Sequence, residues 1–581
     1  MAKSIDSKVL FITTSPRTPE KMIPEIDLLS KNFEGKKWNT ETQIAFMELL
    51  RNENFFNGSG NNDPAFSARD RINRAPKALG FILLEPTIKL TESGKALISA
   101  KRKEEVFLRQ LLKFQIPSPY HTPSEKAADF YVKPYLEILR LIYTLGTLKF
   151  DELMIFGLQL TDYREFDNIV KKIEKFRIDR EKTSKKYREF KYYAQMNELQ
   201  EIYSSELAKG ETSTRESNIA TAKKFLQTKA SNMHDYADAC IRYLRATGLV
   251  SISHIGRSLS ILTEKKKDVE FILNNISREP VFIDDKAKYL DYLGNSELPK
   301  LLTDNKDSLL QKIKEENPTE QIQESVTIHE LKEKLDDLII TKREKLIQSQ
   351  IAEIKDYKKY DDIQTTFTQI EENDIYDPSL ILEWNVWRGM TMLDGGNIKA
   401  NLKFDDFGNP MSTAQGNMAD IVCDYETFGL TVEVTMASGQ KQYEMEGEPV
   451  SRHLAKFKKE TGKEAYCLFV APTINEACIA HFYGLHNLNI SYYGGKSVIV
   501  PLPLNVFKKM LEDSFKASYI PNPEQVKSFF EYSRWSDTIK VQYLNCRKTK
   551  EYCNEKVRSK FQGRGIKALR RHWNQEGLRT A

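Results

Sequence analysis

Short apolar runs alternate with longer amphipathic stretches in the last third of the chain. Four runs rich in β-branched and aromatic residues are predicted to be strands, at 418–425, 429–435, 465–470 and 497–502. Apolar residues at helical spacing predict helices at 379–388, after Gly439, at 475–483 and at 506–515. This alternation predicts a C-terminal α/β domain, a mixed sheet flanked by helices.

The first half of the chain is predicted to be mainly α, with two places where helices lead into a hairpin. A helix at 41–50 and a basic segment at 65–74 precede a strand pair within 78–94. A second strand pair is predicted at 243–252 and 257–263. Helices followed by a β-wing suggest winged-helix-like modules, which place a helix in the major groove of DNA.

Between these regions, from about Lys286 to Glu372, the sequence is rich in Lys, Glu, Asp, Leu and Ile and has few Gly or Pro residues. This composition predicts one or more long helices that act as a spacer. A sustained four-heptad apolar seam is not evident, so a dimeric coiled coil is the weaker interpretation.

Composition limits the classes of protein that remain. A chain of 581 residues is expected to hold three or four domains. No apolar run reaches the length of a membrane span and the N-terminus lacks a signal peptide, so we expect a cytoplasmic protein with no membrane partner. The six cysteines show no Cys-x-x-Cys spacing, which favours reduced thiols over a zinc site.

The distribution of charge is more informative than the net charge of +5. Lys171 to Lys191 holds ten Lys or Arg residues against four acids, mostly at helical spacing. A solvated helix face and contact with a DNA backbone are both open interpretations of this run. Arg547 to Arg571 holds ten more against two acids, and could be a phosphate-binding arm or an unimportant tail.

The candidate chemistry lies in the predicted hairpin, where Asp420 and Glu433 stand among apolar residues. Carboxylates are costly to desolvate without a cation, and paired carboxylates suit Mg²⁺, so a metal site for phosphodiester hydrolysis is the leading interpretation. Capping, ion pairing or exposure of these acids is the alternative. Glu383 lies between apolar helical positions, and Glu446 and His453 share one face of the next helix.

Several motifs resemble the AlwI-type restriction endonucleases, a family of type IIS enzymes and BstNBI-like strand-specific nicking enzymes. In the cleavage region these are the runs from Gly416 to Asp420, Val432 to Thr435 and Glu444 to Leu454. In the recognition region they are the runs from Ser15 to Lys21 and Ala65 to Arg71. The resemblance covers nearly the whole chain, and it implies a prokaryotic type II DNA endonuclease whose cleavage domain has the PD-(D/E)xK fold.

The resemblance also implies roles for individual residues. The metal ligands would be Asp420, Glu433 and Val434, with Glu383, Glu446 and His453 completing the catalytic set. Many PD-(D/E)xK enzymes have a lysine two residues after the second acid, but this chain has Thr435. Lys441 is a candidate substitute for that charge. In the recognition region, the DNA-binding candidates are Arg17, Arg69, Asp70, Arg71, Arg74 and Lys77.

Pattern and resemblance together predict four domains. These are winged-helix-like recognition subdomains at 1–125 and 126–285, a helical linker at 286–372, and a cleavage domain with a basic arm at 373–581. The spacer would place the cut outside the sequence that is read. Expected partners are double-stranded DNA, a DNA methyltransferase, and, for double-strand cleavage, a small catalytic subunit or a second copy. A repair nuclease and a non-catalytic winged-helix DNA-binding protein are the alternatives.

Overall fold

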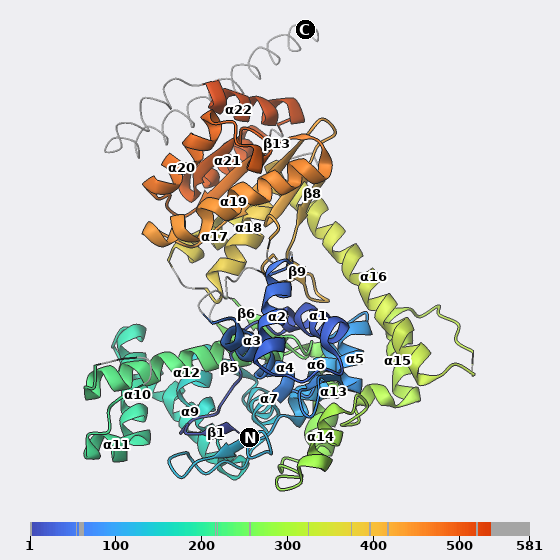
Figure 1. Cartoon of the computed structure of the whole chain (residues 1–581), viewed down its shortest axis with the longest axis vertical. Helices are drawn as coiled ribbons and strands as arrows, with labels where there is room; N and C mark the ends of the chain where they lie inside the picture. Colours follow the sequence, from blue (N-terminus) through green and yellow to red (C-terminus); the bar gives the residue numbers. More distant parts are fainter. Residues whose placement is uncertain are drawn as a thin grey trace. The chain divides into compact units, whose positions relative to one another are not determined.

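A computed structural model describes residues 3–535 apart from 54, 57–62, 215–216, 218, 255–256, 324, 373–374, 394–396, 415–416 and 519–520. The basic run Arg547–Arg571 therefore lies outside the described residues. The chain divides into two compact units, Met1–Ile340 and Thr341–Ala581, and the boundary falls within helix α16 (Ile328–Lys355) (Figure 1). The finer division into four domains stays a prediction. No described helix is long and apolar enough to cross a membrane.

The first unit begins with helices that lead into a short antiparallel ribbon. Its early elements are α1 (Met22–Phe33), α2 (Thr40–Arg51), α3 (Pro64–Ile72), α4 (Ala75–Ala78), β2 (Ile82–Leu83), β3 (Lys89–Leu90), α5 (Glu92–Ser99) and α6 (Glu104–Lys113). Asn39 and Asp63 cap α2 and α3 by accepting hydrogen bonds from backbone N–H groups. Apolar residues of α1, α2, α3 and the ribbon share one core. Helices precede the β2–β3 ribbon and a helix follows it, as the sequence predicts. The winged-helix assignment stays a prediction.

The second predicted strand pair is also present, and a third strand joins it. The elements are α7 (Pro134–Leu145), β5 (Thr147–Lys149), α8 (Phe150–Ile155), α9 (Phe166–Lys182), α10 (Tyr187–Ile202), α11 (Ser204–Lys209), α12 (Ala222–Arg245), β6 (Val250–Ser253), β7 (Ser258–Ile261) and α13 (Lys266–Asn275). The strand order is β5-β7-β6, and both pairings are antiparallel. A separate parallel pair joins β1 (Lys3–Ile5) to β4 (His121–Pro123).

The spacer region is helical, as its composition predicts. Its helices are α14 (Lys286–Gly294), α15 (Lys306–Glu316), α16 and α17 (Tyr360–Glu371). Leu331 and Leu335 of α16 pack with residues of α15 in the first unit, and Ile354 belongs to the main core of the second.

The second unit contains the predicted mixed sheet. Five strands lie in the order β14 (Ile499–Pro503), β13 (Glu464–Ala471), β12 (Phe428–Val434), β11 (Ile421–Asp424) and β8 (Asn397–Ala400). The pairs β12–β13 and β13–β14 are parallel, whereas β11 is antiparallel to both of its neighbours. A small hairpin of β9 (Lys403–Phe404) and β10 (Pro410–Ser412) stands apart. The helices are α18 (Pro378–Leu393), α19 (Gly439–Thr461), α20 (Glu476–Asn487), α21 (Leu504–Ala517) and α22 (Pro523–Trp535).

Each face of this sheet has its own apolar core because side chains alternate along every strand. On β13, Tyr466, Leu468 and Val470 pack into a core shared with α18 and α21. Cys467 and Phe469, on the opposite face, pack with residues of α19 and α20. Helices thus cover both faces of the sheet (Figure 1).

Candidate active site and nucleic-acid interface

The register of the β11–β12 hairpin brings Asp420 and Glu433 together. Ile421 pairs with Val432, so the two acids occupy the next pair of positions, at the open end of the hairpin. Ile421 and Val432 point into the core beneath α18. Because side chains alternate, both acids face the opposite side, toward α19. The Oδ2 atom of Asp420 accepts a hydrogen bond of 2.7 Å from the Val434 N–H.

Helices supply the other three candidate residues. Nδ1 of His453, on α19, lies 2.9 Å from Oε1 of Glu433, whose side chain is only 6% exposed. Glu446 lies two turns earlier on α19 and is hydrogen-bonded to Thr435. Glu383 of α18 is buried and accepts a 2.9 Å hydrogen bond from the Ala414 N–H. The structure therefore gathers all five residues that the sequence singles out.

The carboxylates at this site make ionisation unfavourable for one another. Burial, and then the negative charge of Glu433, raise the pKa of Asp420 well above its ordinary value. Burial followed by the charges of Glu446 and Glu383 does the same to the pKa of Glu433. Burial also raises the pKa of Glu446. A concentration of buried negative charge this strong favours a bound cation.

His453 has the opposite shift. Burial, and then the charge of Arg452, lower its pKa to about 4. The imidazole is therefore neutral near pH 7, and in that form Nδ1–H can donate to the Glu433 carboxylate. This geometry suits a residue that orients Glu433 more than one that accepts a proton near neutral pH.

Positive charge reaches the site from α19 and not from β12. Thr435 is nearly buried, and its hydroxyl accepts a 3.0 Å hydrogen bond from the Ala437 N–H. Lys441 is exposed in the first turn of α19. Arg452 is the cation whose charge opposes the pKa rise of Glu433. Sequence inspection missed Arg452, although its place next to His453 on a helix beside the two acids was a usable signal.

The donor set fits a hard divalent cation by its chemistry. Carboxylate oxygens are the ligands that Mg²⁺ prefers, and the raised pKa values of Asp420, Glu433 and Glu446 show that nearby positive charge does not offset their burial. In the described part of the chain, no group of three or more His, Cys, Asp or Glu side chains is already arranged to hold a metal ion.

In the first unit, four of the predicted DNA-binding residues lie on α3 or α4, Arg74 lies between these helices, Arg17 lies before α1, and most of the six have protein partners. The Arg69 guanidinium donates a 2.8 Å hydrogen bond to Gln43, and Arg74 pairs with Asp70. Lys77 of α4 lies over the ring of Tyr120, and burial lowers its pKa.

Arg71 and Arg17 also have acidic partners. Arg71 forms an ion pair with Glu25 of α1, a buried carboxylate 46 residues away in sequence, and its guanidinium also covers the Phe56 ring. Arg17 lies 2.9 Å from Asp235 of α12, with 46% of its side chain exposed.

Two further cations lie around Arg71, together with acidic residues. Burial lowers the pKa of Lys21, the charges of Arg242 and Arg71 lower it further, and the charges of Glu25 and Glu20 oppose this shift. Sequence inspection listed neither Lys21 nor Arg242. Lys21 lies within the motif Ser15–Lys21, whereas Arg242 is on α12 and no local signal in the sequence connects it to this place.

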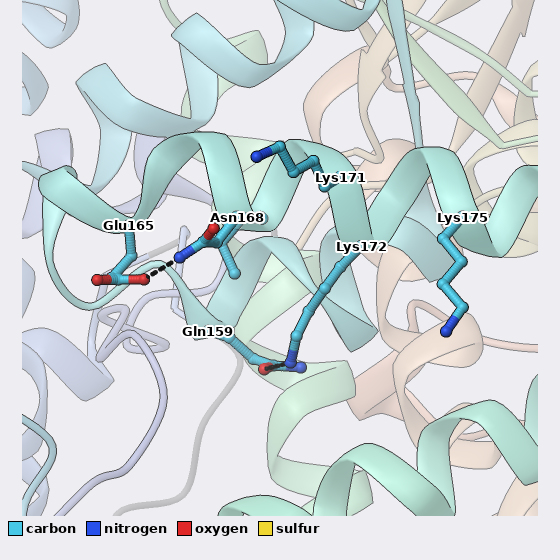
Figure 2. A pocket seen from close by; sticks show the side chains of 7 residues that line it. Gln159, Glu165, Asn168, Lys171, Lys172 and Lys175 are labelled. Atoms are coloured by element: carbon cyan, nitrogen blue, oxygen red, sulfur yellow. Dashed lines mark hydrogen bonds between the residues drawn. The ribbon is translucent and has the colours of Figure 1, made fainter.

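The basic run Lys171–Lys191 divides into paired and unpaired side chains. Arg177 donates to the buried Glu152, and Lys191 pairs with Asp151. An open depression of about 500 Å³ lies along the start of α9, where Lys172 is held by Gln159 and Glu198. Figure 2 shows that Lys172 and Lys175 extend to one side of α9, whereas Lys171 extends to the other. All three lysines line the same open depression.

The chain was compared with family models, curated proteins and solved structures. A family model described as AlwI restriction endonuclease matches residues 77–510. No curated protein matches the chain. One similar solved structure is the small subunit (R.BspD6I2) of the heterodimeric restriction endonuclease R.BspD6I, at 29% identity and a TM-score of 0.28, covering 32% of this chain and 94% of that one. Another is the BpuJ1 endonuclease binding domain in complex with modified DNA, at 13% identity and a TM-score of 0.34, covering 49% and 96%.

Proposed function

Because the chain belongs to the AlwI restriction endonuclease family, whose members are DNA-cleaving hydrolases, we propose that it is a type IIS restriction endonuclease or a site-specific nicking endonuclease. It binds a short asymmetric duplex sequence and hydrolyses a phosphodiester bond a few base pairs outside it. The observation that carries this proposal is the convergence of Asp420, Glu433, Glu446 and Glu383 at one end of a hairpin.

In the proposed mechanism, Asp420, Glu433 and the carbonyl of Val434 would hold Mg²⁺. When bound, Mg²⁺ would polarise the scissile phosphate and lower the pKa of the attacking water. His453 holds Glu433 in one orientation through the 2.9 Å hydrogen bond. Glu446, which is hydrogen-bonded to Thr435, is the residue proposed to accept a proton from that water. Its raised pKa is closer to neutral pH than that of an ordinary carboxyl group, which favours a general base. The Arg452 guanidinium supplies fixed positive charge that the motif lysine would otherwise provide.

The recognition and cleavage functions are assigned to separate units. The first unit, through α3 and the cations around Arg71, would read sequence, and the second would cut. One acidic cluster hydrolyses one strand at a time, so double-strand cleavage requires a small catalytic subunit or a second copy. A DNA methyltransferase would protect the host's own sites.

A plasmid assay tests this proposal. The protein should nick or linearise supercoiled plasmid with Mg²⁺ and not with EDTA, and run-off sequencing of both strands should give one site, a fixed offset and the strand preference. Cleavage at random positions would favour a repair nuclease. Specific binding without cleavage would favour a non-catalytic DNA-binding protein.

Neutralising the unpaired lysines of α9 should lower affinity without changing specificity. Among the described residues, Lys171 and Lys175 make no ion pair or hydrogen bond, and both are exposed. If they face phosphates, the Lys171→Ala/Lys175→Ala protein should bind cognate and scrambled duplexes more weakly to the same extent. The slope of log affinity against log salt should fall by about 1 to 2.

The matched control for this prediction is Lys95→Ala, which removes an exposed lysine of α5 that pairs with Glu92. It should leave the salt slope unchanged. A loss confined to the cognate duplex in the α9 variant would instead place base-reading contacts on α9.

A further inference from the structure

The turn that leads into β11 is held from α19 by two cations. Asn417 has φ of +61°, a left-handed conformation that is uncommon outside glycine and best tolerated by Asn and Asp. Its Oδ1 atom accepts a hydrogen bond from Arg452, and its carbonyl oxygen accepts one of 3.1 Å from Lys456 Nζ. Both the side chain and the backbone of this one residue are therefore anchored.

The two cations are placed for this role by their spacing. Arg452 and Lys456 are four residues apart on α19, so they project from the same face of the helix. Nε of Arg452 donates to both carboxylate oxygens of Glu448, at 3.1 and 3.2 Å, which fixes the plane of its guanidinium. The Arg452 and Lys456 side chains are 32% and 28% exposed, so their hydrogen bonds are partly shielded from water.

The hairpin register places Asp420 opposite Glu433, and Asn417, three residues before Asp420, fixes the backbone that leads into this strand. The same helix carries His453, which is hydrogen-bonded to Glu433. The same helix thus holds the hairpin at two places: it contacts Glu433 of β12 through His453, and it contacts the turn before β11 through Asn417.

We propose that Arg452 and Lys456 are positioning residues that clamp Asn417 in its left-handed turn and, together with the hairpin register, hold Asp420 in place beside Glu433 for metal binding. This inference rests on the proposed function, because it concerns the metal site of the same hydrolytic reaction. It assigns the cations of α19 a geometric role in addition to the charge that Arg452 supplies to Glu433.

The first experiment compares Arg452→Ala, Lys456→Ala and Arg452→Lys with Lys459→Ala, an exposed lysine on the same helix. One readout is the rate of plasmid cleavage. The other needs no DNA: the increase in Tm with Mg²⁺ concentration, which reports metal binding to the folded protein. We expect each alanine variant of the clamp to cleave at least tenfold more slowly and to need at least threefold more Mg²⁺ for half of the Tm increase. Arg452→Lys should recover part of the cleavage rate and part of the Mg²⁺ affinity. Lys459→Ala should match the wild type in both measurements.

A second pair of variants separates the turn from its side chain. Asn417→Gly and Asn417→Ala both lose the Oδ1 acceptor, but only alanine is strained at positive φ. If the conformation of the turn positions Asp420, the glycine variant should keep more activity and a lower Mg²⁺ midpoint than the alanine variant. The two Asn417 variants also test the proposal if the Arg452→Ala protein does not fold.

An unchanged Mg²⁺ midpoint in folded Arg452→Ala and Lys456→Ala would overturn the clamp, as would equal behaviour of the two Asn417 variants. Wild-type protein that cleaves no plasmid would instead overturn the proposed function. In that case, a shift of the Mg²⁺ midpoint between wild type and the clamp variants would still support the positioning of Asp420.

Discussion

Replacing Asp420 with Asn or Glu433 with Gln is expected to abolish DNA cleavage while sparing DNA binding. Each change removes a charged metal ligand but keeps the shape of the side chain, so the loss of water activation should raise the barrier by several kcal/mol, about a thousandfold or more in rate. Recognition is proposed for the other unit, so DNA binding should be unaffected. Plasmid cleavage and gel-shift titration measure the two effects separately.

The same variants should be more stable than the wild type in the absence of metal. Burial and neighbouring carboxylates raise the pKa of both acids, so their ionised forms destabilise the fold at neutral pH. Asn and Gln have the same shape but no charge, so each substitution should raise the free energy of unfolding by about 1 kcal/mol. Mg²⁺ should raise the Tm of the wild type and have little effect on the variants. Wild-type cleavage by either folded variant would refute the site, and a lower apo Tm would contradict the electrostatic argument.

Replacing Arg71 with Ala is expected to destabilise the first unit. Glu25 is 4% exposed, and burial raises its pKa, against the opposing charge of Arg71. Its Oε2 atom has no hydrogen-bond partner, so removing Arg71 would leave a buried carboxylate with almost no compensation. We expect the free energy of unfolding, measured with denaturant, to fall by about 2–3 kcal/mol.

The double variant Arg71→Ala/Glu25→Gln tests whether Arg71 also reads DNA. Neutralising Glu25 should recover much of the stability, so that binding can be measured on a folded protein. If Arg71 contacts a base as well, cognate preference should stay reduced by about 1–3 kcal/mol in the double variant. If its role is structural, cognate preference should return with stability. Arg69→Ala is the companion variant, because Arg69 contacts only the neutral Gln43 among the hydrogen bonds described.

The acidic hairpin could be predicted from the sequence because its information is local. Alternating apolar residues fix which way each side chain of β11 and β12 points, and the turn between them fixes the pairing. The spacing of Glu446 and His453 likewise predicts a helix with both side chains on one face. These local rules were enough to gather five site residues, even though their catalytic roles stay proposals.

Contacts distant in sequence could not be predicted in the same way. Nothing near Arg71 indicates that Glu25 is its partner, and nothing near Asn417 indicates that Arg452 and Lys456 will hold it. The three-residue strand β5 is too short to show a period, and it forms only because β7 offers it a free edge. Such features depend on the packing of whole elements.

Glu433 also has a consequence for how the sheet assembles. It follows Val432 on β12, and these two neighbours face opposite sides of the sheet. A slip of one residue in strand pairing would drive the Glu433 carboxylate into the apolar core beneath α18 and bring Val432 out of it, at a cost of several kcal/mol. The residue proposed for chemistry therefore also penalises misaligned pairing, so its loss could admit misfolded forms during synthesis that the wild-type chain rejects.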